Sequence, residues 1–164
     1  MSRPISWHGE LLHIHIAAAG SHEMESLQQA TLVAGRGIEG DRYYLGTGTY
    51  SQLPAVRDVT LIESEVLEAI ARNDPPLQEQ PLVITPDEHR RNLTVRGVPL
   101  AHLVGVRFRV GEAVLRGARL NFPCRYLEQL LGKPVYQPLY NRSGINCAIE
   151  TGGVIRPGDR IEPL

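Results

Sequence analysis

The sequence predicts a mostly β fold, a closed or partly closed β-barrel with a few short helices in its connections. Glycine (16 residues) and proline (12 residues) recur along the whole chain of 164 residues. They separate short runs that are β-branched or that alternate between apolar and polar side chains. Helical spacing of apolar residues occurs in only two stretches. A barrel is favoured over a small open sheet because closure removes exposed strand edges.

The strands expected in the first half of the chain are short and apolar. Residues 12–16 alternate strictly, which predicts that Leu12, Ile14 and Ile16 share one face and that the two histidines between them share the other. Two further runs have the apolar composition of buried strands. They span residues 31–34 and 59–62.

The longer of the two helices is predicted over residues 63–72. Its side chains Val66, Leu67 and Ile70 fall on one helical face, and an Asn-Asp-Pro-Pro sequence then ends it. The stretch 75–88 is rich in proline, glutamine and acidic residues. We expect it to form a long surface loop.

The second half of the chain supplies the remaining strands. A turn at Gly111-Glu112 should join two of them as a hairpin. The expected strands are residues 92–96, 106–110, 113–120, 144–151 and 160–163. No linker or repeat divides the chain, so we expect a single domain over residues 1–164.

The charge of the chain excludes bulk nucleic acid as a partner. Lys+Arg is 17 and Asp+Glu is 18, so the net charge of −1 provides no overall basic field. Lys133 is the only lysine, and every other basic side chain of this count is an arginine. A GC-rich genome would produce this bias without functional meaning. Arginine is nevertheless well suited to anions, because its planar fork pairs bidentately with phosphate or carboxylate.

Nothing in the sequence indicates secretion or membrane insertion. Residues 1–10 lack the cationic start and apolar core of a signal peptide, and no apolar run approaches the roughly 18 residues that would span a bilayer. Two cysteines, Cys124 and Cys147, do not form the disulfide framework of a secreted domain. We therefore expect two free thiols, a cytoplasmic location and no membrane partner.

Cys124 is the strongest candidate for chemistry. It follows a strand-like run and precedes a short helix, predicted from leucines at three- and four-residue spacing and ended by Gly132. The start of a helix offers unpaired N–H groups and the positive end of the helix dipole, both of which stabilise a thiolate. Arg125 acts in the same direction. The alternative is that Cys124 is a small buried hydrophobe, the commonest fate of a free cysteine.

Two charged loops are further candidates. In residues 35–42 three glycines allow the backbone to turn tightly and approach a ligand, and Gly40 and Asp41 belong to this loop. Arg90, Arg91 and Asn92 stand at the entrance of an apolar strand, where they could hold an anion. Each loop also has a plainer interpretation, in which its charges pair locally or are simply solvated.

The remaining titratable residues give weaker signals. His13 and His15 share a strand face, but a metal site needs further ligands and no residue has the spacing to supply them. His89 and His102 are isolated in the sequence. Cys147 lies in an alternating run, so we expect it to be packed in a strand.

Four motifs follow one another along the chain. They are residues 37–42 (Gly-Ile-Glu-Gly-Asp-Arg), 91–95 (Arg-Asn-Leu-Thr-Val), 123–124 (Pro-Cys) and 152–159 (Gly-Gly-Val-Ile-Arg-Pro-Gly-Asp). In this order they resemble the MOSC domain, the C-terminal domain of molybdenum-cofactor sulfurases. The resemblance covers nearly the whole chain, which is similar to a compact stand-alone bacterial member. One departure is Tyr43-Tyr44 after Arg42, where many members place a histidine.

The resemblance implies a β-barrel with a cysteine at the mouth of a cleft. Cys124 would carry sulfur as a persulfide or would ligate molybdenum in a bound pterin, the molybdenum cofactor. The Gly40-Asp41 loop would shape the same cleft. The cofactor-binding candidates are Arg91, Asn92, Gly40 and Asp41 by resemblance, with Arg125 and Arg142 added on physical grounds.

Three functions remain open at this point. A sulfur carrier would need an external cysteine desulfurase to load Cys124, because Lys133 ends a helix and is no candidate for a pyridoxal-phosphate Schiff base. A molybdenum-dependent reductase of N-hydroxylated substrates would use the same thiolate and would receive electrons from separate redox proteins. A small ligand-binding β-barrel without chemistry would bury Cys124.

Overall fold

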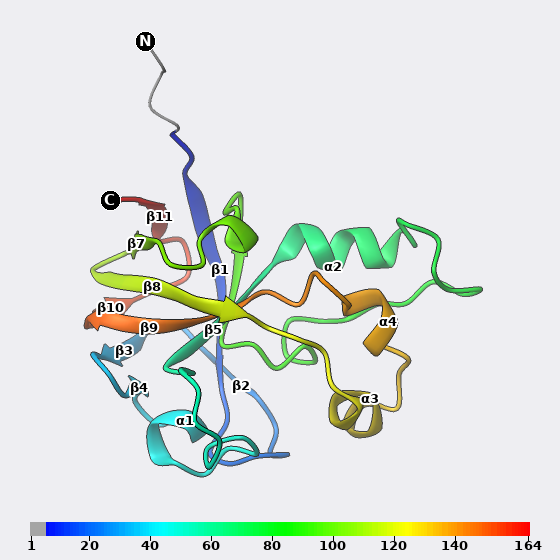
Figure 1. Ribbon diagram of the computed structural model, residues 1–164, viewed down its shortest axis with the longest axis horizontal. Coiled ribbons are helices and arrows are strands. Elements are labelled where there is room, and N and C mark those ends of the chain that lie inside the picture. The colour runs from blue at the N-terminus through cyan, green and yellow to red at the C-terminus, as the bar shows by residue number, and fades with distance from the viewer. Residues whose placement is uncertain (1–5) are drawn as a thin grey trace.

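The computed structural model describes residues 6–164 and contains a closed β-barrel (Figure 1). Eight strands pair in the order β11-β7-β8-β9-β5-β6-β1-β2, and β11 also pairs with β1. The sheet therefore closes on itself through seven strands, with β2 as an extension, and a smaller sheet has the order β10-β3-β4. The mostly β barrel predicted from the sequence is confirmed.

The strands and helices have the following bounds. The strands are β1 (Gly9–Ile16), β2 (Glu25–Leu27), β3 (Ala30–Val33), β4 (Gly37–Ile38), β5 (Val59–Glu63), β6 (Leu93–Arg96), β7 (Arg107–Val110), β8 (Ala113–Leu120), β9 (Ile145–Thr151), β10 (Gly153–Ile155) and β11 (Arg160–Pro163). The helices are α1 (Arg42–Leu45), α2 (Ser64–Ala71), α3 (Arg125–Leu131) and α4 (Tyr136–Leu139), with a 3₁₀ turn, η1, at Leu100–His102. No helix among residues 6–164 is long and apolar enough to cross a membrane.

One pairing in the barrel is parallel. β5 and β6 run in the same direction, with Leu61 opposite Leu93, whereas the other named strand pairs are antiparallel. A parallel pair requires a crossover, and the chain makes it through α2 and the long connection that follows. This crossover carries α2 to one side of the barrel, where α3 and α4 also lie (Figure 1).

Two hydrophobic clusters hold the fold together. The first fills the barrel and includes Leu11, Ile14 and Phe108, all fully buried. The second lies outside the barrel, among α2, α3, α4 and the connection after α2. Leu127 of α3 belongs to this second cluster. Burial of such a side chain stabilises the fold by about 1.5–3 kcal/mol, so the start of α3 is firmly anchored.

The first strand shows where strict alternation is wrong. The pairing of β1 with β6 shifts register between Leu11 and His13, as in a β-bulge. One extra residue reverses the facing of the strand. Leu11 is therefore fully buried and Leu12 only partly, while His15, expected on the outer face, is 5% exposed.

Most other predicted elements are confirmed. The hairpin between β7 and β8 forms at the expected turn, and α2 and α3 lie where apolar spacing placed them. Residues 75–88 contain no helix or strand. The elements that were not predicted are β2, β4, β10, α1, α4 and the 3₁₀ turn η1, which have only two to four residues each. Such short elements carry too few residues to show a period.

Candidate functional site

Cys124 lies at the junction of β8 and α3. The chain leaves β8 after Leu120, passes through Pro123 and reaches Cys124, which has extended backbone angles (φ −135°, ψ 154°) and directly precedes the helix. α3 ends at Gly132, whose φ of 64° is the left-handed conformation predicted for the helix end. Cys124 is half-buried and lines a cavity of about 280 Å³.

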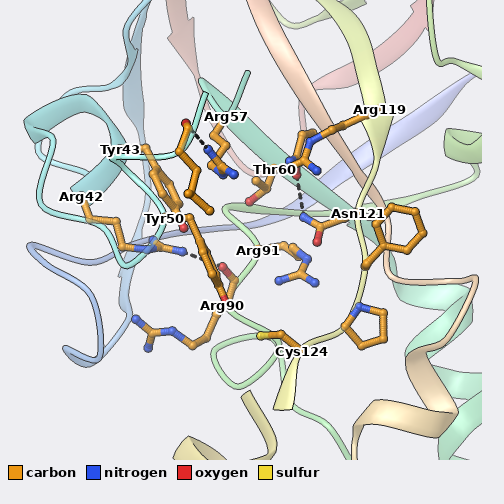
Figure 2. Close-up of a pocket in the computed structure, with 14 residues that line it drawn as sticks. Arg42, Tyr43, Tyr50, Arg57, Thr60, Arg90, Arg91, Arg119, Asn121 and Cys124 are labelled. Atoms are coloured by element: carbon orange, nitrogen blue, oxygen red, sulfur yellow. Dashed lines mark hydrogen bonds between the residues drawn. The ribbon is translucent and has the colours of Figure 1, made fainter. Parts of the chain in front are cut away.

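Five arginines share this cavity with Cys124, and we call it the arginine cavity (Figure 2). They are Arg42, Arg57, Arg90, Arg91 and Arg119. The other lining residues are Tyr43, Tyr50, Leu53, Thr60, Asn121, Phe122, Pro123 and Asn146. No carboxylate lines the cavity, and among residues 6–164 only Arg42 of the five is ion-paired. The cavity is therefore strongly cationic and suited to an anion.

Arg91 is held beside Cys124 by main-chain carbonyls. Its Nε donates to the carbonyl of Ser143 (3.2 Å) and its Nη1 to the carbonyl of His89 (3.3 Å). Burial lowers the pKa of Arg91 to about 10, and the nearby Cys124 opposes this change. Arg91 is thus a cation at neutral pH. In Figure 2 its guanidinium lies between Asn121 and Cys124.

His89 fixes the backbone of Arg91 from behind. It is fully buried, its Nδ1 accepts the Arg91 backbone N–H (2.8 Å), and its Nε2 lies 2.8 Å from Thr94 Oγ1. Because Nδ1 accepts, the ring proton is on Nε2, which donates to Thr94. Burial lowers the pKa of His89 well below its ordinary value, so the ring is neutral. This residue, isolated in the sequence, supports the site.

Asp41 acts on the cavity through Arg42. Its carboxylate is fully buried, accepts the backbone N–H of Ala17 (3.2 Å), caps α1 at Tyr43 (3.2 Å) and pairs with Arg42 (2.9 Å). Arg42 Nη2 in turn donates to the carbonyl of Arg90 (2.9 Å). Asp41 itself does not line the cavity. It orients the arginine that does.

Gly40 shapes the same loop without lining the cavity. Its φ of 86° is a left-handed conformation that favours glycine. The turn that it makes places Asp41 directly before α1. Gly40 therefore contributes through the backbone, as a loop-shaping residue would.

Arg90 has a free donor. Its backbone has a φ of 64°, and its Nη1 donates to the carbonyl of His22 (2.8 Å). Its Nη2 is buried and has no hydrogen-bond partner among the residues that the structure describes. An unpaired buried donor costs free energy that an anionic ligand would recover.

Tyr50 adds a neutral donor to the cavity. Burial, and then the neighbouring Cys124 sulfur, raise the pKa of Tyr50 above its ordinary value. Its phenol therefore keeps its proton at neutral pH. Arg57 lies over the Tyr50 ring, 5.8 Å from the centroid, and donates to the carbonyl of Leu53 (3.1 Å). The segment between α1 and β5 thus contributes three lining residues to the cavity.

Besides Gly40 and Asp41, three predicted site residues lie outside the arginine cavity. Asn92 is fully buried. Its Oδ1 accepts hydrogen bonds from the backbone N–H and the hydroxyl of Thr60, and its Nδ2 donates to the carbonyl of His15 (each 3.1 Å), so Asn92 fixes Thr60, which lines the cavity. The Arg125 side chain is 77% exposed and pairs with a glutamate one turn later (3.5 Å). Arg142 donates to main-chain carbonyls and lines a separate cavity of about 110 Å³.

The two cysteines have different surroundings. Cys147 is 0% exposed in β9, and burial raises the pKa of its thiol. Both cysteines are free, but only Cys124 faces the arginine cavity. In residues 6–164, no three or more His, Cys, Asp or Glu side chains are grouped to hold a metal ion. His13 and His15 therefore have no such group around them.

Comparison with known proteins decides the family. The model of the MOSC domain matches residues 48–162. The chain belongs to the MOSC family. Members of this family are associated with the molybdenum cofactor. A search of curated proteins gave no significant sequence match.

Solved structures share the MOSC fold. The YUAD protein from Bacillus subtilis superposes with a TM-score of 0.77 at 21% identity, covering 95% of this chain and 97% of that chain. YiiM from Geobacillus stearothermophilus gives 0.68 at 14% identity, covering 95% and 75%. YiiM from Escherichia coli gives 0.65 at 19% identity, covering 98% and 70%. At these identities the likeness shows the fold alone.

Several lining residues of this cavity were not expected from the sequence. The missed lining arginines are Arg42, Arg57 and Arg119. Each lies at or beside the end of a strand or short helix, and the near absence of lysine was the only sequence signal that concerned them. Arg42 lies before the segment that the family model matches, whereas the other two lie within it.

Proposed function

We propose that this MOSC protein binds the molybdenum cofactor in the arginine cavity and that the sulfur of Cys124 contacts the bound cofactor. The observation that carries the proposal is that Cys124 opens into a cavity that, in the described part of the chain, is lined by five arginines and no carboxylate. Arginine forks pair well with a pterin phosphate, and thiolate is a soft donor suited to a transition metal.

The donor set fits such a ligand. Arg90 Nη2 is buried and unpaired among the described residues, and Arg91 is fixed by carbonyls with no competing carboxylate. These two arginines would hold the anionic end of the cofactor, and Cys124 would contact its metal. When bound, a molybdenum centre supplies two-electron redox chemistry. The protein would supply orientation, charge neutralisation and the neutral Tyr50 hydroxyl as a hydrogen-bond donor.

Sulfur carriage is the second role that we propose for Cys124. The thiol is half-buried in the cavity, where it neighbours the Tyr50 hydroxyl. Lys133 pairs with Glu88 (2.7 Å) and does not line the cavity, so sulfur would come from an external cysteine desulfurase. Such a partnership and two free thiols fit a reducing, cytoplasmic setting.

A reductase would use the same residues with a different partner. N-hydroxylated substrates would be reduced at the bound cofactor, and separate redox proteins would supply the electrons. This activity requires the cofactor, whereas sulfur carriage requires only Cys124. A ligand-binding barrel without chemistry requires neither. Cofactor content therefore separates the candidates first.

The test is the molybdenum and pterin content of protein purified from a host that makes the cofactor. Molybdenum would be measured by elemental mass spectrometry and pterin by fluorescence. We expect near-stoichiometric amounts of both, loss of molybdenum in Cys124→Ser, and loss of molybdenum and pterin in Arg91→Gln. Arg109→Gln, which removes an exposed arginine on β7, is the control for the loss of charge alone.

Two outcomes would contradict the proposal. Absence of both molybdenum and pterin from the unmodified protein would contradict the proposal of cofactor binding and leave sulfur carriage as the proposed role. Equal pterin content in Arg91→Gln and Arg109→Gln would contradict the assignment of the arginine cavity as the cofactor site. Thermal unfolding of each variant would establish that it is folded.

A further inference from the structure

We infer that Cys124 is loaded with sulfur directly by a small sulfane-sulfur dianion, of which thiosulfate is the simplest. The inference rests on the proposed sulfur-carrier role of Cys124. The donor class is a sulfane sulfur attached to an anionic leaving group. Such a donor would act in addition to the protein donor named above. The argument has three steps, which concern charge, access and chemistry.

The charge of the cavity is the first step. Four of its five arginines have no carboxylate partner among residues 6–164, and no acidic side chain lines the cavity. Charge-assisted hydrogen bonds from arginine to oxyanions are among the strongest in proteins. Arg90 Nη2 has no hydrogen-bond partner within residues 6–164, and Arg91 is adjacent to Cys124. A dianion would be concentrated beside the sulfur atom that reacts with it.

Access to Cys124 is the second step. The thiol faces a cavity of about 280 Å³ rather than a convex surface. Leu53 and Phe122 line this cavity and are 54% and 57% exposed, so they stand at its rim. A protein-bound persulfide must reach past this rim, and its carrier loop must fit inside. A dissolved anion has no such requirement.

The chemistry is the third step, and it needs no added oxidant or reductant. The Cys124 thiolate attacks the outer sulfur of thiosulfate, a bond forms between the two sulfurs, and the sulfur–sulfur bond of thiosulfate breaks. Sulfite leaves with the electron pair of that bond. The products are a Cys124 persulfide and a sulfite dianion. Arginine side chains stabilise the charge that develops on the leaving group.

A second half-reaction makes loading measurable as turnover. Cyanide attacks the outer sulfur of the persulfide, takes it as thiocyanate and returns the Cys124 thiolate. Each cycle consumes one thiosulfate and one cyanide and releases one sulfite and one thiocyanate. Neither half-reaction needs an external oxidant or reductant.

The experiment uses the full chain purified from a host without molybdenum cofactor, so that the cavity is free. Protein is mixed with thiosulfate, sulfite release is measured, and the mass gain of one sulfur atom is located by peptide mass spectrometry. Cyanide is added in a second series, and thiocyanate is followed. We expect one sulfite per protein, the added sulfur on Cys124, and no reaction in Cys124→Ser.

Arginine variants test the role of charge. In Arg90→Gln and Arg91→Gln the thiosulfate concentration for half-maximal loading should rise about ten- to a hundredfold, as expected for loss of a charged hydrogen bond. Arg109→Gln on the outer surface should leave it unchanged. Two variants are used so that a folding failure of one leaves the other informative. With a neutral organic trisulfide, the Cys124 thiolate attacks a terminal sulfur, forms a mixed disulfide and releases an organic persulfide anion, and this reaction should depend little on either arginine.

Three results would overturn the inference. They are an absence of sulfite release, sulfur added at Cys147 instead of Cys124, and equal loading in the cavity variants and the surface control. Pterin binding is measured on a separate preparation from a cofactor-making host. Normal pterin binding without thiosulfate loading would therefore refute this inference alone and leave the proposed cofactor site intact.

Discussion

Replacing Glu63 with glutamine should stabilise the folded protein at pH 8 and change little at pH 4. Glu63 ends β5 and lines the cavity of about 110 Å³ that also contains Arg142, and its side chain does not cap α2. Burial, and to a lesser degree Glu65, raise the pKa of Glu63 from 4.5 to about 7. The folded protein therefore holds this proton more tightly than the unfolded chain does.

The sign and the size of the effect follow from linkage. Because the folded pKa lies above the unfolded one, Glu63 imposes no cost below pH 4.5, and stability falls as the pH rises through 7. A rise of this size corresponds to about 3 kcal/mol, and partial solvation in the cavity reduces the expected cost to roughly 1–3 kcal/mol. Glutamine has nearly the same shape and no charge, so Glu63→Gln removes that cost.

The assay is urea unfolding of both proteins between pH 4 and pH 8. The difference in unfolding free energy should grow from near zero to about 1–3 kcal/mol across that range. Glu79→Gln, an exposed glutamate in the 75–88 loop, is the matched control and should give a flat difference. A Glu63→Gln difference that is constant with pH, or that favours the glutamate at pH 8, would refute the reasoning.

Two further predictions concern the core and the thiols. Gly144→Ala should cost more than about 3 kcal/mol in urea unfolding, because its φ is 83° and the added carbon would lie 1.8 Å from the Leu61 carbonyl oxygen. Gly105→Ala has a similar φ of 80° but open space, so a comparable loss there would contradict the steric argument. In the folded protein iodoacetamide should modify Cys124 and spare the fully buried Cys147, as peptide mass spectrometry would show; the reverse pattern would overturn the site.

The second hydrophobic cluster explains why the site is precise. α3 has seven residues, too few to be stable by itself. Leu127 ties it to α2 and to Leu82 and Ile84 of the 75–88 loop. The segment that leads from β8 into α3 is therefore held at both ends. Cys124 owes its place to packing more than to helix propensity.

The class of fold and the candidate cysteine could be found from the sequence because their signals are local. Strand periods, glycine turns and the α3 end signal at Gly132 depend on neighbouring residues only. Cys124, Arg91 and the Gly40-Asp41 loop were likewise found as short motifs. The family match confirms the resemblance that these motifs suggested.

The arginine cavity itself was decided by the tertiary structure. Arg42, Arg57 and Arg119 come from α1, the segment before β5, and β8, and nothing in their local sequence shows that they meet. The direction of Arg119 depends on an irregular pairing of β8 with β9 between Gly117 and Arg119. A shift of one residue in a strand turns a side chain to the other face.

The same reason explains where sequence and structure differ. The bulge in β1 brings Leu11 into the core in place of Leu12, and the burial of His89 against Thr94 places its ring behind the backbone of Arg91. Asn92 and Arg142 carry suitable groups, yet Asn92 is directed toward Thr60, and Arg142, in the connection between α4 and β9, lines a separate cavity. The sequence by itself determined the kinds of groups available, whereas register and barrel closure determined which of them converge on Cys124.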